Sequence, residues 1–351
     1  MVVKKLVRPL VANRAYRLQE MTSRAVDMLA VDRGGVREAT HAGHLAVVDK
    51  SGSLVASLGD PERVTYYRSC AKPFQALAGL GTGIMERFHL EPAHIAVMSA
   101  SHNGEPRHVD TVRDLLRRAA IPEEALQCGA HWPLHEPSAE AARREYEKPI
   151  AVFNNCSGKH AGMLAAAKAL GAPLDSYLDR QHPVQVRIRE VVAEFTDCDP
   201  STMQFGTDGC SAPNPAVPLS AIALSLARLG GSDEPAAKQV VEAMTANPFL
   251  TGGTDRFDTR LMEVSGGRIL AKGGAAGLQV VLDRRSGQGL ALKLESGDGA
   301  YIAAAVLRAM AGLGWLDEGE EQALASFARP KLRNHRRIEV GAVEPLFEVR
   351  L

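Results

Sequence analysis

The chain has 351 residues, and its 41 Lys and Arg residues balance its 41 Asp and Glu residues, so the formal net charge is zero. This balance argues against nucleic acid or an anionic membrane as the main partner, because both demand a basic surface. Hydrophobic residues make up 45% of the chain and charged residues 23%, which is typical of a globular protein, and no apolar run approaches the length of a membrane span.

The first 24 residues show no clear periodicity and are predicted to form an N-terminal arm, so that residues 25–351 form a single domain. Apolar runs at 44–49 and 53–59 flank a turn that contains Gly52, which predicts a β-hairpin. Helical spacing and short apolar runs predict further elements. Helices are expected at 108–119, 184–196, 219–229, 236–245 and 299–314, and strands at 93–98, 150–153 and, last in the chain, 337–343.

Residues 268–295 contain three strand-like runs, divided first by Lys272-Gly273-Gly274 and then by a glycine-containing turn at 285–289, which predicts an antiparallel meander. The expected helices lie between clusters of neighbouring strands and do not alternate with single strands. This order favours an α+β fold, with an antiparallel sheet flanked by helices, over a doubly wound parallel sheet.

A serine and a lysine lie at the start of one expected helix. Pro73 marks the first turn, and Ser69 and Lys72 are three residues apart, so their side chains would lie on one side of that turn. This S-x-x-K arrangement occurs in serine acyl-transfer enzymes, where a neutral lysine takes the hydroxyl proton. The alternative is that Ser69 only caps the helix and that Lys72 is a solvated residue of its first turn.

Two weaker motifs follow in the order found in penicillin-recognising serine enzymes. Ser101-His102-Asn103 is an S-x-N sequence after the expected strand 93–98, where it would aim a hydroxyl and an amide into a cleft. Lys272-Gly273-Gly274 resembles a K-T-G element with glycine in place of threonine. Each motif alone is also typical of an ordinary turn, but their order favours a serine hydrolase with two Ser–Lys pairs, Ser69–Lys72 and Ser101–Lys272.

The five cysteines are few and odd in number, which favours free thiols over a disulfide framework and predicts a cytoplasmic protein. Cys156 and Cys210 lie in glycine-containing loops, and Cys156 would stand at a helix N-terminus that favours a thiolate. Two thiolates and one nitrogen ligand would suit Zn²⁺ with water in the fourth position, and by chemistry alone His160 is the expected nitrogen ligand. The alternative is a pair of buried free cysteines. Cys70, next to Ser69, predicts a site that is sensitive to oxidation.

Five strings of residues carry a resemblance to a known family. They are RSCAKPFQ (68–75), SASHNGE (99–105), NNCSGKHAGML (154–164), GTDGCSAPNPAVPL (206–219) and LAKGG (270–274). In this order they resemble the signatures of the rhizobial-type, or class 3, L-asparaginases, from about residue 25 to the C-terminus. The resemblance implies a fold similar to serine β-lactamases and glutaminases, a homodimer, and hydrolysis of L-asparagine to L-aspartate and ammonia by one catalytic domain.

The resemblance also implies roles for single residues. Ser69 matches the nucleophile and Lys72 its base, while Ser101 and Lys272 match a second Ser–Lys pair. The zinc ligands would be Cys156, Lys159 and Cys210, so Lys159 replaces His160 as the nitrogen ligand, and Arg68, His160 and Asp208 would contact the substrate. Two alternatives stay open: another serine amidase, such as a glutaminase or a β-lactamase-like hydrolase, and a non-catalytic zinc-binding protein on this scaffold.

Overall fold

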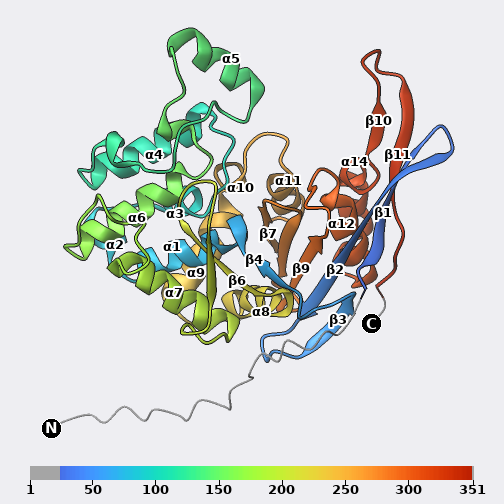
Figure 1. Ribbon diagram of the computed structural model, residues 1–351, viewed down its shortest axis with the longest axis horizontal. Helices are drawn as coiled ribbons and strands as arrows, with labels where there is room; N and C mark the ends of the chain where they lie inside the picture. The colour runs from blue at the N-terminus through green and yellow to red at the C-terminus, as the bar shows by residue number, and fades with distance from the viewer. Residues whose placement is uncertain (1–23, 350–351) are drawn as a thin grey trace.

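The structure, a computed structural model, describes residues 24–349 (Figure 1). The arm predicted for residues 1–24 lies outside this range except for its last residue, so the division into arm and single domain stays a prediction. The predicted α+β class is confirmed, because a large antiparallel sheet stands beside and between helices (Figure 1). None of the helices within residues 24–349 is long and apolar enough to cross a membrane.

The large sheet has eight strands in the described part of the chain, in the order β10-β11-β1-β2-β9-β8-β7, with β3 paired to β2. Its strands are β1 (Val26–Arg33), β2 (Val36–Val48), β3 (Leu54–Leu58), β7 (Ile269–Gly274), β8 (Leu278–Asp283), β9 (Gln288–Leu294), β10 (Lys331–Arg333) and β11 (Glu339–Pro345). The predicted hairpin and the predicted meander are therefore confirmed as β2–β3 and β7–β8–β9. A second sheet has the order β4 (Val64–Tyr66), β6 (Pro213–Pro218) and β5 (Gln204–Thr207).

The central part of the large sheet, formed by β8, β9 and the second half of β2, is buried on both faces, which explains its long apolar runs. Side chains alternate along a strand, so Ala46 and Val48 of β2 enter the core on one face, and Leu45 and Val47 enter the core on the other. The first core lies under most of the helices, including α8, which packs on β2, β8 and β9; the second lies under α11 and α12. This alternation decides which face each strand residue serves.

The helices are α1 (Lys72–Leu80), α2 (Ile84–Arg87), α3 (Pro92–Met98), α4 (Pro106–Arg118), α5 (Glu136–Glu145), α6 (Ser157–Ala169), α7 (Pro183–Thr196), α8 (Leu219–Gly230), α9 (Pro235–Ala246), α10 (Pro248–Thr251), α11 (Phe257–Val264), α12 (Ile302–Gly312), α13 (Glu318–Ala323) and α14 (Ala325–Ala328). The helices expected at 108–119, 184–196, 219–229, 236–245 and 299–314 are confirmed as α4, α7, α8, α9 and α12. The last strand expected in the chain is confirmed as β11.

Two predicted strands are wrong. Residues 93–98 lie in helix α3, which begins at Pro92 and has a capping box between Glu91 and His94. Its apolar run has no helical periodicity because α3 is surrounded by α1, α4, α6 and α9, so most of its side chains are buried. Residues 150–153 form only a short 3₁₀ turn, Ala151–Phe153.

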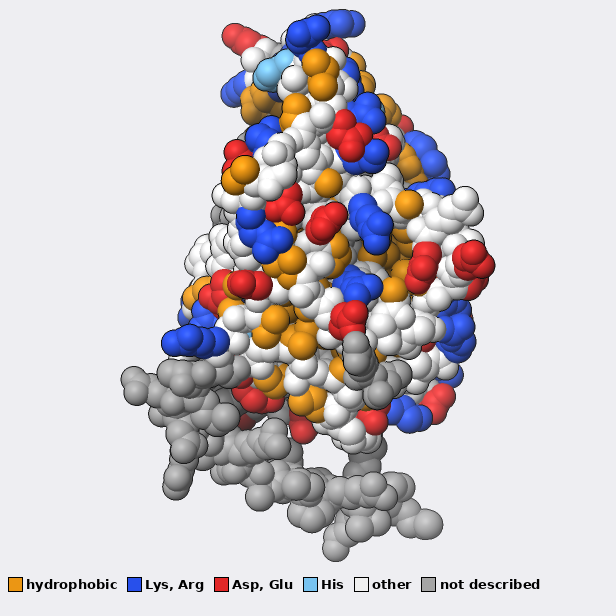
Figure 2. Space-filling model, turned by 90° about the vertical axis from the view of Figure 1, so that its right-hand side faces the viewer, with side chains coloured by type: hydrophobic (Ala, Val, Ile, Leu, Met, Phe, Trp, Pro, Cys, Tyr) orange, Lys and Arg blue, Asp and Glu red, His pale blue; other side chains and the backbone are white. Residues whose placement is uncertain are grey.

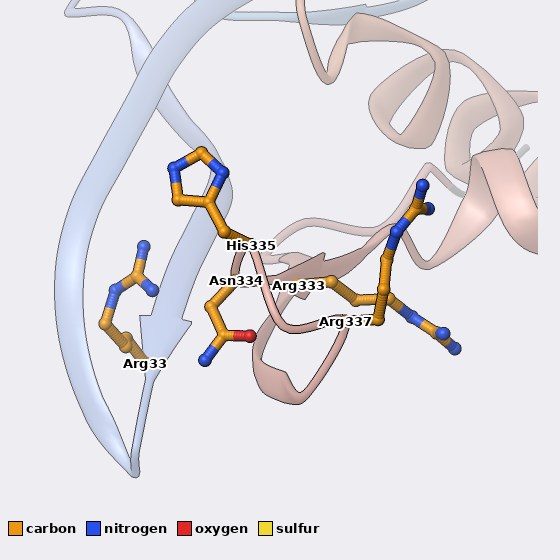
Figure 3. Close-up of a pocket in the computed structure, with 5 residues that line it drawn as sticks. All are labelled: Arg33, Arg333, Asn334, His335 and Arg337. Carbon is orange, nitrogen blue, oxygen red and sulfur yellow. The ribbon is translucent and has the colours of Figure 1, made fainter.

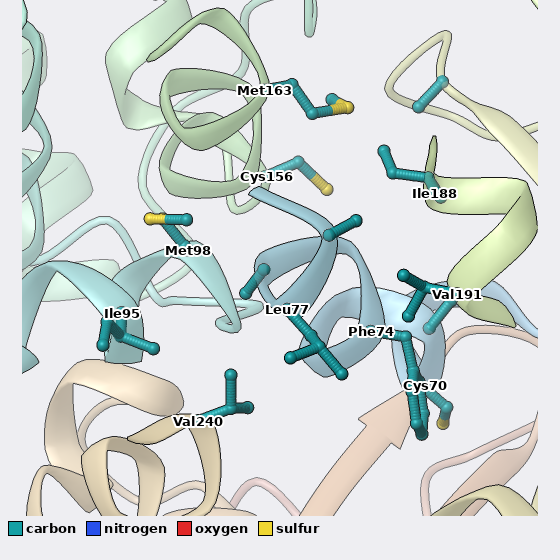
Figure 4. Close-up of a cluster of buried hydrophobic side chains, with 14 of the residues drawn as sticks. Cys70, Phe74, Leu77, Ile95, Met98, Cys156, Met163, Ile188, Val191 and Val240 are labelled. Carbon is teal, nitrogen blue, oxygen red and sulfur yellow. The ribbon is translucent and has the colours of Figure 1, made fainter. Parts of the chain in front are cut away.

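The helical core beside the large sheet brings α1, α3, α6 and α7 together. Figure 4 shows Phe74 of α1 near Val191 of α7, and Met98 of α3 beside α6. The closest approach is at Gly158 in the first turn of α6, where an added Cβ would clash with the carbonyl oxygen of Val97. Glycine at this position lets the start of α6 lie against the end of α3.

Charges are mixed on the surface, in keeping with the zero net charge. On the face drawn in Figure 2, Lys and Arg side chains are interspersed with Asp and Glu side chains, and no single sign dominates.

We expect Gly158→Ala to lower the free energy of unfolding by about 1–3 kcal/mol, because α6 must move away from α3 to admit the methyl group. Urea unfolding followed by circular dichroism measures this loss. Gly299→Ala is the matched control, since the nearest atom to its added Cβ is 3.9 Å away. Equal losses in the two variants would contradict the prediction.

Candidate active site

Lys72 is the first residue of α1 and is 1% exposed. Its Nζ lies 2.6 Å from the carbonyl oxygen of Ala100, 2.8 Å from Ser101 Oγ and 3.2 Å from the carbonyl oxygen of Asn155. The Ser69 hydroxyl, in the 3₁₀ turn just before α1, has no hydrogen-bond partner among residues 24–349. The structure therefore brings Lys72 together with Ser101, and the predicted Ser69–Lys72 pair is not joined by a hydrogen bond.

The surroundings of Lys72 favour its neutral form. Burial lowers the pKa of Lys72; Cys156 opposes this shift and Lys159 reinforces it. A neutral amine has two N–H bonds and one lone pair, and the two carbonyl oxygens accept the N–H bonds. The charged amine donates to all three oxygens, Ser101 Oγ included; once it is neutral, its lone pair can accept the O–H of Ser101, which is the geometry of a general base.

Arg68 stands next to Ser69 in a strained conformation. Its φ angle is 51°, in the left-handed region that non-glycine residues rarely adopt. The conformation is held by Asn214, whose Oδ1 accepts the Arg68 N–H at 2.9 Å, and by Asp208, whose Oδ1 lies 3.2 Å from Arg68 Nη2. The structure thus brings together Arg68 and Asp208, and Arg68 Nε is a buried donor without a partner among the described residues.

Lys272 lies on β7 and alternates with Ala271, so it shares with Leu270 the sheet face that is turned toward the helical core. It is completely buried, and its Nζ donates to its neighbour Gly273 and lies 3.9 Å from Asp258 Oδ2. No hydrogen bond within the described chain joins it to Ser101, so the second predicted pair is not joined either.

The pKa of Lys272 is lowered to about 8. Burial is the main cause; Asp258 opposes it, and the positive charge of Lys72 adds to it. Lys272 is therefore an amine that can exchange a proton near neutral pH, and it lies within electrostatic reach of Lys72.

The residues that follow Ser101 support the site from behind. His102 Nε2 lies 3.0 Å from Ser157 Oγ, and Asn103 Nδ2 donates to the carbonyl oxygen of Thr254 at 2.9 Å. Glu105 binds the same loop through the backbone N–H and the hydroxyl of Thr254. The expectation that Asn103 aims its amide into a cleft is wrong, because this amide ties the Ser101 loop to Thr254 and the Asn103 backbone N–H donates to Gly252.

Cys156, Lys159 and Cys210 form a second buried cluster. Cys156 is the N-cap residue of α6, and Lys159 Nζ lies 2.9 Å from Cys210 Sγ. A hydrogen bond from Cys210 and the charges of Lys72 and Lys159 lower the pKa of Cys156, whereas the Cys156 thiolate and burial raise that of Cys210. Burial disfavours a charged Lys159, yet both thiols together raise its pKa.

This cluster has the donor set of a zinc site. Two thiolates and one amine nitrogen are donors of the kind that Zn²⁺ prefers, and the protons now shared among Cys156, Lys159 and Cys210 are those that a bound metal would displace. Within the described chain no group of three or more His, Cys, Asp or Glu side chains is placed to hold a metal. A site here would therefore depend on the lysine.

His160 is completely buried behind this cluster. Its Nδ1 lies 2.6 Å from Tyr177 Oη, which also accepts the N–H of Gln127 at 2.9 Å. Its Nε2 has no hydrogen-bond partner among residues 24–349, and burial holds the pKa of His160 well below its usual range. The structure gives it Lys159 and Lys72 as electrostatic neighbours, so it lies near the site without bonding to another candidate.

The expectation that Cys70 makes the site sensitive to oxidation is wrong. Cys70 is completely buried, and its Sγ donates to the carbonyl oxygen of Lys272 at 3.2 Å. Burial raises the pKa of Cys70 to about 12, so the reactive thiolate is scarce at neutral pH. Its thiol instead ties the turn that carries Ser69 to β7.

The sequence does not predict the contacts that three residues make in the site: Asn155, Asn214 and Asp258. Asn155 and Asn214 lie inside the motif strings, but their contacts with Lys72 and Arg68 cross long sequence separations. Asp258 has no signal at all, since an acidic residue in the first turn of a helix is ordinary.

A surface hollow of about 560 Å³ lies away from this site, between the β1–β2 and β10–β11 turns. Arg33, Arg333, Asn334, His335 and Arg337 line it (Figure 3). None of the candidate residues lines this hollow. The buried lysines Lys72, Lys159 and Lys272 lie instead on α1, α6 and β7.

Comparison with known proteins identifies one family. A sequence model described as L-asparaginase II matches residues 29–345. No curated protein matches the chain.

Several solved structures resemble the fold at low similarity. A β-lactamase from Mycobacterium bovis is 14% identical, with a TM-score of 0.38, over 82% of this chain and 95% of that chain. A penicillin-binding protein homologue from Pyrococcus abyssi, described as octameric, is 14% identical, with a TM-score of 0.40, over 81% and 76%. A structure described as Mglu in its native form is 16% identical, with a TM-score of 0.41, over 78% and 65%, so this chain spans less than two thirds of it.

Proposed function

The chain belongs to the L-asparaginase II family and is an amidohydrolase, and we propose that it hydrolyses the side-chain amide of L-asparagine to L-aspartate and ammonia. The observation that carries the proposal is the buried amine of Lys72, which lies 2.8 Å from Ser101 Oγ at the start of the helix that follows Ser69. A neutral lysine beside serine hydroxyls is the machinery that acyl transfer requires.

In the proposed reaction the Ser69 oxygen attacks the amide carbon, and its proton passes to Lys72, directly or through Ser101. The C–N bond then breaks, and Lys72 or Lys272 returns a proton to the departing ammonia. Water hydrolyses the resulting aspartyl ester and regenerates Ser69. Lys272 suits the second proton transfer, since its pKa of about 8 lets it give and regain a proton near neutral pH.

The Arg68–Asp208 pair would bind the polar end of the substrate. Arg68 has a buried Nε without a partner in residues 24–349, and this donor suits the α-carboxylate of an amino acid. Asp208 supplies the negative charge for the α-ammonium group, and its side chain is 13% exposed. His160 is completely buried, and its Nε2, which has no partner among residues 24–349, is the atom that we propose for its substrate contact.

Cys156, Lys159 and Cys210 would hold a zinc ion near Lys72, whose charge acts on Cys156. When bound, zinc would supply positive charge that polarises or orients a substrate group. The family resemblance leads us to propose a homodimer, which sedimentation of the purified protein tests. The few cysteines, all free among the described residues, lead us to propose a cytoplasmic location.

The purified protein is expected to release ammonia from L-asparagine faster than from L-glutamine, and to leave a chromogenic β-lactam intact. A coupled ammonia assay and absorbance measure these rates side by side. Faster ammonia release from L-glutamine would make glutamine the preferred substrate, and cleavage of the lactam would indicate a β-lactamase-like hydrolase. Absence of any amide hydrolysis would favour a non-catalytic zinc-binding protein.

Ser69→Ala is expected to lower kcat/KM by at least about 10³-fold, because it removes the nucleophile. Ser99→Ala is the matched control, since the Ser99 hydroxyl is buried without a partner among the described residues and lies two residues from Ser101. Mass spectrometry of acid-quenched enzyme then locates the aspartyl ester. Arg87 lies between the two serines, so trypsin separates them, and an ester on the Ser101 peptide would assign the nucleophile to Ser101.

Cys156→Ser and Cys210→Ser are expected to lose the zinc that the wild-type protein retains after dialysis, because each removes a thiolate ligand. Plasma mass spectrometry measures zinc per chain. Cys128→Ser is the control, because its thiol is also buried but bonds to the carbonyl oxygen of Ala151. Full zinc content in Cys156→Ser would remove the metal site from the proposal.

A further inference from the structure

The residue after Lys272 has an unexpected neighbour. Gly273 stands where a K-T-G element has threonine. An added Cβ at Gly273 would lie 3.1 Å from Gln279 Oε1 and 3.3 Å from Asp258 Oδ2. The Asp258 carboxylate therefore occupies space that a side chain at Gly273 would need, and glycine here admits a buried acid from α11.

Asp258 is 5% exposed and uses both of its oxygens. Its Oδ2 accepts the backbone N–H of Gly273 at 2.7 Å, and its Oδ1 accepts Nε2 of Gln279 at 2.7 Å. Lys272 Nζ lies 3.9 Å from Oδ2. Asp258 therefore clamps β7 to β8 at the position of Lys272, and it stands in the first turn of α11, where the helix dipole favours a negative charge.

The charges that face Lys272 are unequal. From α1 comes Lys72, and from the segment before α11 comes Arg256, both of which disfavour a charged Lys272. Cys70 faces it from the turn before α1, and burial keeps that thiol neutral. Among the described residues, Asp258 is thus the carboxylate that offsets the burial of Lys272, the charge of Arg256 and, when Lys72 is protonated, the charge of Lys72.

We propose that Asp258 is a positioning residue that holds Lys272, an electrostatic neighbour of Lys72, in place for proton transfer. The inference rests on the proposed function, because it assigns Lys272 a proton transfer in that reaction. It adds an acid from α11, a helix that contributes nothing else to the site, and gives a reason for Gly273.

The charge has a definite consequence for the pH dependence. An anion near an amine favours its protonated form, so removing the anion lowers the pKa of Lys272 below its value of about 8. If the Asp258 charge is removed, the limb of the pH–rate profile that reports the titration of Lys272 must move to lower pH.

Asp258→Asn tests the inference, because it removes the charge and keeps an oxygen for the Gly273 N–H, while Gln279 must turn its amide so that Oε1 accepts from the new NH2. The limb of the kcat/KM profile that Lys272→Met abolishes is expected to move down by about 1–3 pH units, with KM near the wild-type value. Asp283→Asn is the matched control: Asp283 is a fully buried carboxylate on β8 that accepts a backbone N–H and pairs with Arg268. It is expected to lower stability without moving the profile.

The profiles are measured on whichever amide the wild-type enzyme hydrolyses. An unmoved profile in folded Asp258→Asn overturns the inference and leaves the proposed function intact, whereas a wild-type enzyme inactive on every amide overturns both. If Asp258→Asn does not fold, Asp258→Ala is assayed with and without formate, a small carboxylate that can fill the vacated space. Restoration of the wild-type profile by formate supports the inference, and no effect of formate on the profile overturns it.

Discussion

The buried amine of Lys72 is the contact on which the site depends. Its three hydrogen-bond partners come from two separate segments: Ala100 and Ser101 follow α3, and Asn155 precedes α6. Removing a charged or polar group from water is costly unless its bonds are satisfied inside the protein. The helical core must therefore bring these segments to within hydrogen-bond distance of α1. Gly158 makes this approach possible, because it lets the start of α6 lie against the end of α3.

Three lysines are buried around this point, and each has a different kind of partner. Lys72 faces carbonyl oxygens and a hydroxyl, Lys159 faces two thiols, and Lys272 faces a carboxylate. Because the three amines are buried close to one another, they cannot all carry a full charge at low cost. Their surroundings give the three lysines different affinities for a proton. The thiols raise the pKa of Lys159, while burial lowers the pKa values of Lys72 and Lys272. This difference supplies both an acceptor and a donor of protons.

Elements with a clear periodicity were predictable, and fully buried ones were not. The meander β7–β8–β9 and helices such as α4 and α8 follow the period of their apolar residues and the turns between them. The sequence predicts a strand where helix α3 lies, because neighbours surround α3 and burial on every side removes the amphipathic signal. The strand predicted at 150–153 is a short 3₁₀ turn, Ala151–Phe153. A run of four apolar residues is too short for its periodicity to distinguish a strand from a helical turn.

The sequence by itself determined the chemical inventory and its family. The motif strings are short and continuous in the sequence, so they and their order can be read without knowing the fold. They surround Ser69, Ser101, Cys156, Cys210 and Lys272. Only the tertiary structure decided which groups meet. It placed Ser101, and not Ser69, on the amine of Lys72, turned Asn103 away toward Thr254, and brought Asp258 to Lys272. Such contacts join residues far apart in the chain, and their distances depend on how helices pack against the sheet, which no local pattern encodes.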